Sequence, residues 1–312
     1  MAYRLRPNES VRRGLRRLAT KQLRAARDDL RGATPPRDEA IHEARKSVKK
    51  VRAILQLIEA DEGTRLRGCR KRLRSVNRTL SGLRDADAMI EILSKLRSRN
   101  PHLFSEHTYA RVRRQLSSHK RAAMEAAELD GAWTTLDDEL RHLRRAAERW
   151  RPAHRGFSAL SPGIELAHRR GRKAMARALA RQTAPDFHEW RKLMKALWYA
   201  LRLVDRSGGR VRRDVSLLHG AETWLGDDHN IVVLCAELSK DAAICGGPVQ
   251  LDRLRLAANR YQGAVRKKAV TLVNRIYAQG SRKYVRGIER AWTRWRQGVG
   301  QDNARARRRT AA

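Results

Sequence analysis

Two stretches of the chain, IHEARKSVKKVRAILQLI from Ile41 and FHEWRKLMKALWYALRLV from Phe187, predict its fold. In each stretch apolar residues recur at steps of three and four, which places them on one face of a helix. The stretches align without a gap at an offset of 146 residues, from 41 to 187. The identical charged or ionisable pairs are His42 with His188, Glu43 with Glu189, Arg45 with Arg191, Lys46 with Lys192, and Lys49 with Lys195. Packing explains matched apolar positions more easily than matched charges, so we expect a duplicated helical unit.

A weaker correspondence follows each of these helices. LSGLRDADAMIEIL from Leu80 and LGDDHNIVVLCAEL from Leu225 both read as a polar turn that leads into an apolar helix. The N-cap candidates in these turns are Asp85 or Asp87 in the first copy, and Asp228 or Asn230 in the second. Each half is therefore expected to contain the same helix, turn and short helix.

Helical periodicity continues along most of the chain, and prolines and glycines interrupt it in RPAHRGFSALSPG. We predict a helical half at 8–150, a linker at 151–161 and a second helical half at 162–298. Together they form one domain over residues 1–298. The remaining segment, 299–312, lacks apolar periodicity and is predicted to be a basic disordered tail. The predicted fold class is all-α, with two related helical bundles arranged by a pseudo-two-fold axis around a basic groove or pore.

Capping and helix-breaking residues divide each half into six helices. In the first half these are expected at about 10–31, 36–61, 64–81, 86–97, 101–129 and 132–150. In the second half they are expected at about 163–182, 186–205, 211–225, 230–241, 249–279 and 282–298.

The charge balance indicates the kind of partner. Among 312 residues there are 70 Lys and Arg against 33 Asp and Glu, a formal net charge of +37. Such a surface attracts polyanions. The chain has no apolar run of about 18 residues and no secretory signal, so we expect no membrane partner. The three cysteines, Cys69, Cys235 and Cys245, are expected to be free thiols in a reducing cytosol.

The duplicated helices each carry a basic stripe. His42, Arg45, Lys49 and Arg52 form the first, and Lys46 lies beside it. His188, Arg191, Lys195 and Arg202 form the second, and Lys192 lies beside it. At 1.5 Å per residue the first stripe is about 15 Å long, which suits a linear chain of anionic groups. A solvated helix face is the alternative interpretation, but apart from Glu43 and Glu189 neither stretch contains the acids that such a face interleaves.

Three further helices have basic faces that could line the same groove. They contain Lys21 in the first helix, Arg74 and Arg78 in the third, and Arg169, Arg172 and Lys173 in the first helix of the second half. Metal binding by His42 or His188 is disfavoured because neither has a second ligand at HxxxH or HxxE spacing. Asp85 and Asp87, or Asp227 and Asp228, could hold Mg²⁺, although caps and turns explain them as well. Phosphate-cradling and nucleophile motifs are absent from the sequence.

At IHEARKSVKKVRAIL the chain resembles the CHAD domain, the conserved histidine α-helical domain. A histidine near the start of a helix, followed by basic residues at helical spacing, is the hallmark of this family. The turns RDAD at 84–87 and LGDDHN at 225–230, and the segment AHRRGRKAMARA at 167–178, are also similar to family sequences. The resemblance implies two related helical bundles around a basic groove that binds inorganic polyphosphate and can localise to polyphosphate granules. Some members carry a triphosphate-hydrolysing tunnel domain; because the helical pattern starts near residue 8, we do not expect that domain or its catalytic role here.

We therefore expect a cytoplasmic protein at polyphosphate granules that binds inorganic polyphosphate without catalysis and without a cofactor or metal. The expected ligand-binding residues are Lys21, His42, Arg45, Lys46, Lys49, Arg52, Arg74, Arg78, Arg84, Arg169, Arg172, Lys173, His188, Arg191, Lys192, Lys195, Arg202 and His229. The alternatives are a nucleic-acid-binding protein, for which the charge is equally suitable, and a hydrolase of phosphate chains. A granule scaffold that recruits other proteins is a third alternative.

Overall fold

The computed structural model describes residues 3–32, 38–62, 66–82 and 85–310. Within these ranges the chain is all-helical and contains no strand, as the apolar periodicity predicted. Helix starts follow the capping residues: the Ser10 and Thr183 side chains accept hydrogen bonds from the backbone N–H groups three residues later. No helix in the described ranges is long and apolar enough to span a bilayer.

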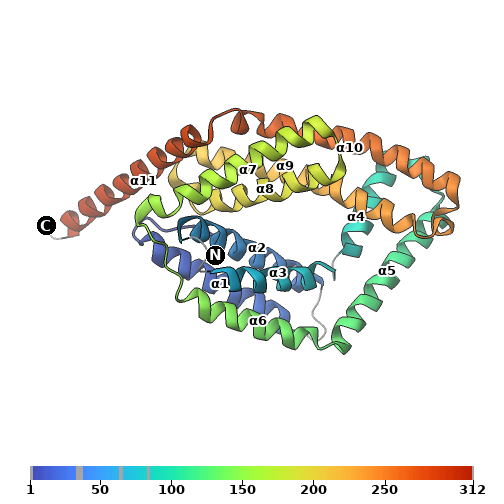
Figure 1. The fold of residues 1–312 in the computed structure, drawn as a ribbon, viewed down its shortest axis with the longest axis horizontal. Coiled ribbons are helices and arrows are strands. Elements are labelled where there is room, and N and C mark those ends of the chain that lie inside the picture. Colours follow the sequence, from blue (N-terminus) through green and yellow to red (C-terminus); the bar gives the residue numbers. More distant parts are fainter. Residues whose placement is uncertain (1–2, 33–37, 63–65, 83–84, 311–312) are drawn as a thin grey trace.

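The helices form two layers (Figure 1). The N-terminal layer consists of α1 (Val11–Arg31), α2 (Asp38–Glu62), α3 (Arg67–Gly82) and α6 (Ala132–Ala147). The C-terminal layer consists of α7 (Ser161–Arg181), α8 (Ala184–Arg202), α9 (Gly209–Leu238) and α10 (Pro248–Tyr277). In each layer the first helix packs along the second, α1 on α2 and α7 on α8. The two layers therefore present α2 and α8, the helices with the basic stripes, on their facing sides.

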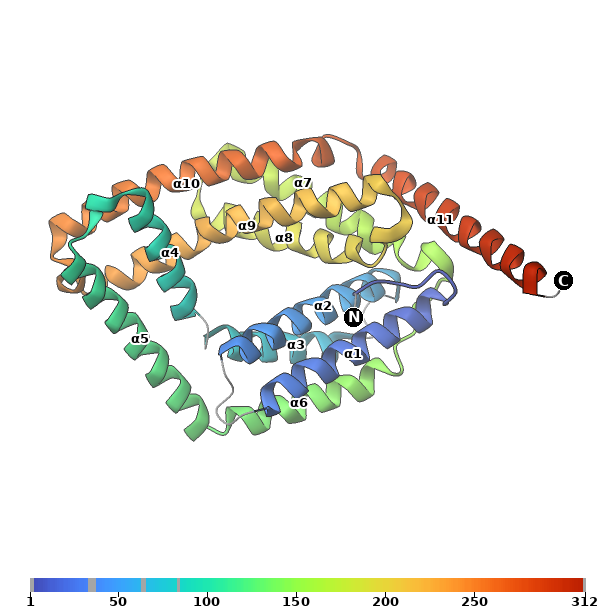
Figure 2. The same ribbon diagram turned by 180° about the vertical axis from the view of Figure 1, so that it is seen from behind.

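A pair of helices connects the two layers at one end of the molecule. α4 (Asp85–Arg99) and α5 (Glu106–Leu129) pack on each other and on the ends of α9 and α10 (Figure 2). Their apolar side chains form a second core that includes Leu93, Leu116, Leu234 and Leu254. This core closes one end of the space between the layers.

The main core is shared by the two halves of the chain. Buried side chains of α1, α2, α3 and α6 belong to the same apolar cluster as those of α7, α8 and α11 (Ser281–Thr310). α7 approaches α2 closely at Gly163, where an added Cβ would lie 2.6 Å from Leu57 Cδ2 and 2.8 Å from Leu57 Cα. The segment between the halves is also packed, since Phe157, Ala159 and Leu160 are buried. The halves thus form one folded body.

The order of helices is similar in the two halves. α7, α8, α10 and α11 follow one another as α1, α2, α5 and α6 do, and α2 and α8 begin 146 residues apart, at 38 and 184. α9 stands where the first half has α3 and α4. The sequence predicted two helices here as well, at 211–225 and 230–241, and the structure corrects that prediction with one continuous helix, α9.

The reason lies in the residues that were read as a turn. Asp227 and Asp228 are buried in the middle of α9 and bind other helices instead of capping a new one. Asp227 accepts hydrogen bonds from Tyr261 (2.7 Å) and Lys95 (2.9 Å), and Asp228 accepts from Arg266 (2.7 Å). Their polarity is satisfied by tertiary contacts, so the helix does not need to break.

The C-terminal segment also differs from the prediction. α11 extends to Thr310, whereas the sequence predicted a helix end at Gly298 and a disordered tail at 299–312. Residues 301–310 contain no proline or glycine, and Ala and Arg are among the best helix formers, so the helix continues without an apolar stripe. This helix leads away from the two layers (Figure 1).

Candidate functional site

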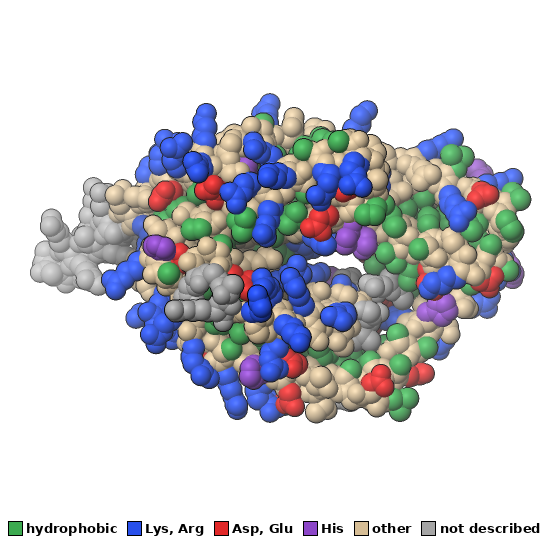
Figure 3. Space-filling view, in the orientation of Figure 1, with side chains coloured by type: hydrophobic (Ala, Val, Ile, Leu, Met, Phe, Trp, Pro, Cys, Tyr) green, Lys and Arg blue, Asp and Glu red, His purple; other side chains and the backbone are tan. Residues whose placement is uncertain are grey.

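A cavity of about 1160 Å³ lies between the two layers. Its described lining contains eleven Lys and Arg residues, four Asp and Glu residues and four histidines. Lys and Arg side chains lie on both sides of the opening in the space-filling view (Figure 3). The cavity is therefore a strongly basic space with two facing walls, one formed by α2 and the other by α8 and α9.

Eleven of the residues predicted from the sequence line this cavity. From α2 they are His42, Arg45, Lys46, Lys49 and Arg52; from α8 they are His188, Arg191, Lys192, Lys195 and Arg202; and from α9 there is His229. The structure thus brings both basic stripes to one space, and the helix periodicity explains why, since the opposite faces of α2 and α8 are buried in the main core.

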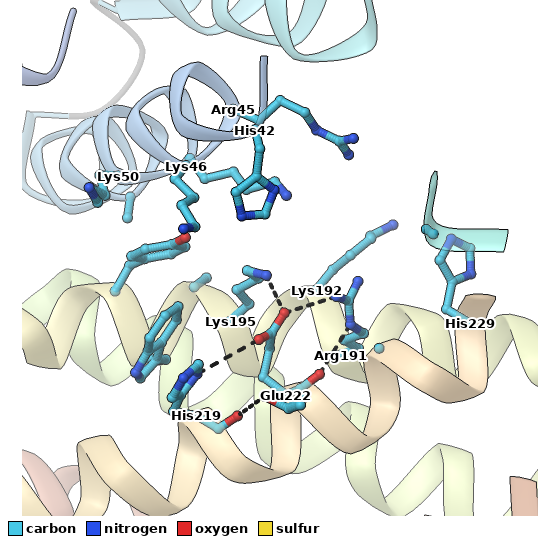
Figure 4. Close-up of a pocket in the computed structure, with 18 of the residues that line it drawn as sticks. His42, Arg45, Lys46, Lys50, Arg191, Lys192, Lys195, His219, Glu222 and His229 are labelled. Carbon is cyan, nitrogen blue, oxygen red and sulfur yellow. Dashed lines mark hydrogen bonds and ion pairs between the residues drawn. The ribbon is translucent and has the colours of Figure 1, made fainter. Parts of the chain in front are cut away.

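The cations of the α2 wall differ in their partners and in how deeply they are buried. The Arg45 guanidinium donates to Ser81 Oγ at 3.2 Å, and Lys46 pairs with Glu43 on its own helix at 2.6 Å. Lys49 lies deeper: burial, together with the charges of Lys195, Arg45 and Arg191, lowers the pKa of Lys49 to about 6. His42 and Lys46 extend from this wall toward α8 and α9 (Figure 4).

The α8 wall repeats part of this arrangement. Lys192 pairs with Glu189 at the same spacing of three residues as Lys46 with Glu43. Arg202 lies over the ring of Trp198 at 4.8 Å, a cation–π contact that holds the guanidinium at the cavity wall. Burial lowers the pKa of Lys195, and Arg191 adds to the effect. Both walls therefore contain an ammonium group whose charged form is disfavoured by burial and by neighbouring cations.

Glu222 of α9 lies between these cations. Its side chain is 7% exposed and accepts hydrogen bonds from Arg191 Nη2 at 2.9 Å and from Lys195 Nζ (Figure 4). Burial alone would raise the pKa of Glu222, but Lys195 and Arg191 outweigh it, so this pKa lies below the ordinary value. The carboxylate is charged at neutral pH and neutralises part of the α8 stripe.

Gly226 explains how Arg191 reaches this carboxylate. A Cβ at Gly226 would lie 3.2 Å from Arg191 Nη2, so the missing side chain leaves room for the guanidinium against α9. There Arg191 Nε also donates to the backbone carbonyl of Glu222 at 3.3 Å. Arg191 is thus held at a defined place on the cavity wall.

Two pairs of rings complete the α8–α9 wall. His188 and His229 have ring centroids 3.9 Å apart, and burial lowers both pKa values, that of His229 to about 4. His219 is stacked on Trp198 with centroids 4.7 Å apart. The first pair is neutral at pH 7, and the second covers one face of the indole.

The remaining predicted residues lie elsewhere. Arg169, Arg172 and Lys173 are exposed on the face of α7 opposite to its buried residues, so they correct the expectation that this helix lines the groove. Arg74 and Arg78 are exposed on α3, and Lys21 is half-buried on α1. None of these six is among the described residues that line the cavity. Burial is the main cause that lowers the pKa of Arg52, and the charge of Arg74 is the second cause. Arg84 lies outside the described residues.

Several residues that line the cavity do not belong to the two predicted stripes. They are Lys50, Lys95, Arg212, His219, Glu222 and Asp227, together with the aromatic Trp198 and Tyr199. Most of them are on α4 or α9, which have no basic stripe. For Glu222 the sequence did contain a signal: Leu218, Glu222 and Leu225 are spaced by four and three, so an acid occupies an apolar position of the helix.

Of the acidic residues considered for Mg²⁺, Asp87, Asp227 and Asp228 bind protein cations, and the Asp85 side chain lies outside the described part of the structure. Asp87 accepts from Lys120 at 2.8 Å, and Asp227 and Asp228 have the partners described above. The described part of the chain contains no group of three or more His, Cys, Asp or Glu residues arranged to hold a metal. All three cysteines are free, and Cys245 is buried.

The fold and the cavity define a class of protein: an all-helical body whose two layers enclose a basic space lined by a histidine-led stripe from each half. The chain belongs to the CHAD-domain family, because the model of the CHAD domain matches residues 9–239. This confirms the resemblance that the sequence indicated.

Two solved structures have a similar fold. PptA from Streptomyces chartreusis is 19% identical, with a TM-score of 0.61 over 85% of this chain and 100% of that one. The CHAD domain from the plant Ricinus communis is 17% identical, with a TM-score of 0.56 over 93% of this chain and 95% of that one. No curated protein matches the sequence.

Proposed function

We propose that this protein binds inorganic polyphosphate in the cavity between its layers and does not turn it over. The observation that carries the proposal is the excess of Lys and Arg over Asp and Glu on two walls that face each other. Consecutive phosphates would contact cations of both walls, and the release of their counterions would drive binding. The CHAD-family membership supports the same ligand class.

The geometry favours a bare phosphate chain over a nucleic acid. α2 and α8 contact each other, and the charges of Lys195 and Arg191 of α8 help to lower the pKa of the buried Lys49 of α2, so the two basic stripes lie close together. The aromatic residues also disfavour base stacking, because Trp198 already packs against His219 and Arg202. A cationic space in which the described indole is already covered suits a ligand that has charge but no bases.

Binding without catalysis agrees with the state of the acids in the cavity. Glu222 is hydrogen-bonded to Arg191 and Lys195, and Asp227 is hydrogen-bonded to Lys95 and Tyr261. These carboxylates are engaged with protein groups instead of being placed to activate a water. A hydrolase would instead release phosphate from the chain, and a phosphate assay on the samples of the binding experiment measures that release.

The test is competition between long-chain polyphosphate, duplex DNA and single-stranded RNA at moderate and high salt. The binding variant changes Arg45, Lys46, Lys49 and Lys192 to Gln, which leaves Arg191 and Lys195 to neutralise the buried Glu222. Its matched control changes Arg169, Arg170, Arg172 and Lys173 to Gln, which removes the same number of basic side chains from the exposed face of α7. Circular dichroism checks that both variants keep their helices.

We expect polyphosphate to outcompete both nucleic acids, the cavity variant to lose at least tenfold in affinity, and the α7 control to lose much less. Equal losses in the two variants would mean that net charge alone binds the ligand. A clear preference for DNA or RNA would assign the cavity to nucleic acid. The same proposal places the protein at polyphosphate granules in the cytoplasm, which a fluorescent fusion of wild type and cavity variant tests.

A further inference from the structure

A buried carboxylate in the middle of a cavity for anions is an unexpected feature. Glu222 reaches the cavity from α9 and touches cations of α8, and its Oε2 lies 4.0 Å from His219 Nδ1. Lys49 of the facing α2 wall also contributes to the low pKa of Glu222. Groups of three helices therefore converge on this one carboxylate.

The contacts of Glu222 are those that a phosphate would make. Arg and Lys bind carboxylate and phosphate oxygens with the same charge-assisted hydrogen bonds. The other acids of the α2 and α8 walls are placed differently: Glu43 and Glu189 pair with a lysine of their own helix and are 44% and 38% exposed. Glu222, at 7%, is buried between cations of the α8 stripe, whereas Asp227, the other buried acid of the described lining, pairs with Lys95 of α4.

We propose that Glu222 is an internal counter-anion. It holds Arg191 and Lys195 in the ligand-free protein, and phosphate groups of the ligand displace it from these two cations. This rests on the proposed function. Each phosphate that binds at this point must compete with a carboxylate already in contact with both cations. Glu222 therefore lowers the affinity of the central part of the cavity and speeds release of the chain.

Glu222 also limits which anions remain bound. A single phosphate that takes Arg191 and Lys195 from Glu222 leaves the carboxylate beside it, and the two negative charges repel each other. A chain offsets this cost because its other phosphates contact Arg45, Lys46 and Lys192 at the same time. The residue thus favours ligands whose charges are linked.

The first test compares Glu222→Gln with Glu43→Gln. Both variants remove one negative charge from the cavity lining, but only the first frees Arg191 and Lys195. With long-chain polyphosphate we expect Glu222→Gln to bind about tenfold more tightly, mainly through slower dissociation. Glu43→Gln should change affinity by less than about threefold. Weaker binding by Glu222→Gln would overturn the proposal, because it would make Glu222 a positioning residue.

A double-mutant cycle measures the competition itself. Lys195→Met should cost little affinity in the wild type, where Lys195 is committed to Glu222, and several-fold more in the Glu222→Gln background. Equal costs in the two backgrounds would contradict the displacement of Glu222. Should Glu222→Gln not fold, Glu222→Asp retracts the carboxylate and is expected to bind at least twofold more tightly than wild type; no gain would also overturn the proposal.

The outcomes for the two proposals are separable. If wild-type protein fails to prefer polyphosphate, or if the four-residue cavity variant binds it normally, the proposed function fails. If wild type binds as expected and Glu222→Gln gives no gain, only the role of Glu222 fails.

Discussion

At the scale of single residues, the charge states of the Lys and His side chains that line the cavity depend on their burial and on neighbouring charges. The stripes on α2 and α8 were predictable because every member follows the helix period in the sequence. Glu222 was missed, since its relation to Arg191 and Lys195 arises only when α9 packs on α8. Local spacing identifies neighbours on one helix and does not identify the partner that a second helix supplies.

Lys49 is expected to reduce the stability of the empty protein. The pKa of Lys49 is about 6 in the folded state and near 10.5 in the unfolded state, so between these pH values unfolding takes up a proton. The contribution of Lys49 to the free energy of unfolding therefore falls as the pH decreases from about 10 to 6. Lys49→Met should therefore raise the Tm at pH 7 by about 2–4 °C while weakening polyphosphate binding. Calorimetry checks this, with the half-exposed Lys46→Met as control. A lower Tm for Lys49→Met would contradict the account.

Polyphosphate binding is expected to take up protons at pH 7. Burial is the main cause that lowers the pKa values of Lys49, His188 and His229. An anion beside them favours their charged forms and raises these values. Affinity should therefore increase as pH falls from about 8 to 5.5. Calorimetric titrations in buffers of different ionisation enthalpy measure the uptake, and Lys49→Met combined with His188→Gln and His229→Gln should abolish most of it.

At the scale of elements, most predicted helix starts lie within a few residues of the observed ones, but the helix predicted from 101 begins at Glu106, after the Ser105 cap. The helix starting after Ser10 is an example of close agreement, because the cap and the stripe are both local. The prediction was wrong at LGDDHN, where two adjacent acids imitate a turn. Tyr261 and Arg266 lie more than 30 residues away in the chain, and their bonds to Asp227 and Asp228 cannot be read from local sequence.

Replacement of two glycines by alanine should have opposite effects on stability, because only Gly163 lies where α7 approaches α2. Gly163→Ala places a methyl group against the backbone of Leu57 and should destabilise the protein by about 1–3 kcal/mol. Gly263→Ala, within α10, meets no atom within 4 Å and should stabilise it by about 0.5–1 kcal/mol. Urea denaturation measures both. Equal effects of the two changes would show that the layers do not meet at Gly163.

At the scale of the whole molecule, charge and duplication indicated a polyanion binder, but not the way the halves pack. Apolar periodicity tells which face of a helix is buried and leaves open what it is buried against. The shared main core and the outward position of Arg169 and Arg172 on α7 follow from that packing. The structure places the predicted residues of α2 and α8 at one cavity and those of α7 on an exposed face, and which of them bind a ligand stays a prediction.

The salt dependence of binding should separate the cavity from the rest of the positive surface. The logarithm of the polyphosphate affinity should fall linearly with the logarithm of salt concentration. Each cation removed from the cavity should reduce the magnitude of this slope by about 0.7–0.9. For the four-residue cavity variant the slope should therefore be smaller than that of the wild type by about three. The matched α7 variant should keep nearly the wild-type slope. A common slope for all three proteins would mean that the ligand does not enter the cavity.

The continuous α9 helix belongs to both apolar cores: Leu218 and Leu225 lie in the main core, and Leu234 and Leu238 lie in the second. One rod without a hinge therefore joins the cavity wall to the helices that close its end. The two cores are thus coupled through a single helix, and the cavity wall on α9 is mechanically continuous with the packing of α4 and α10 at the end of the cavity.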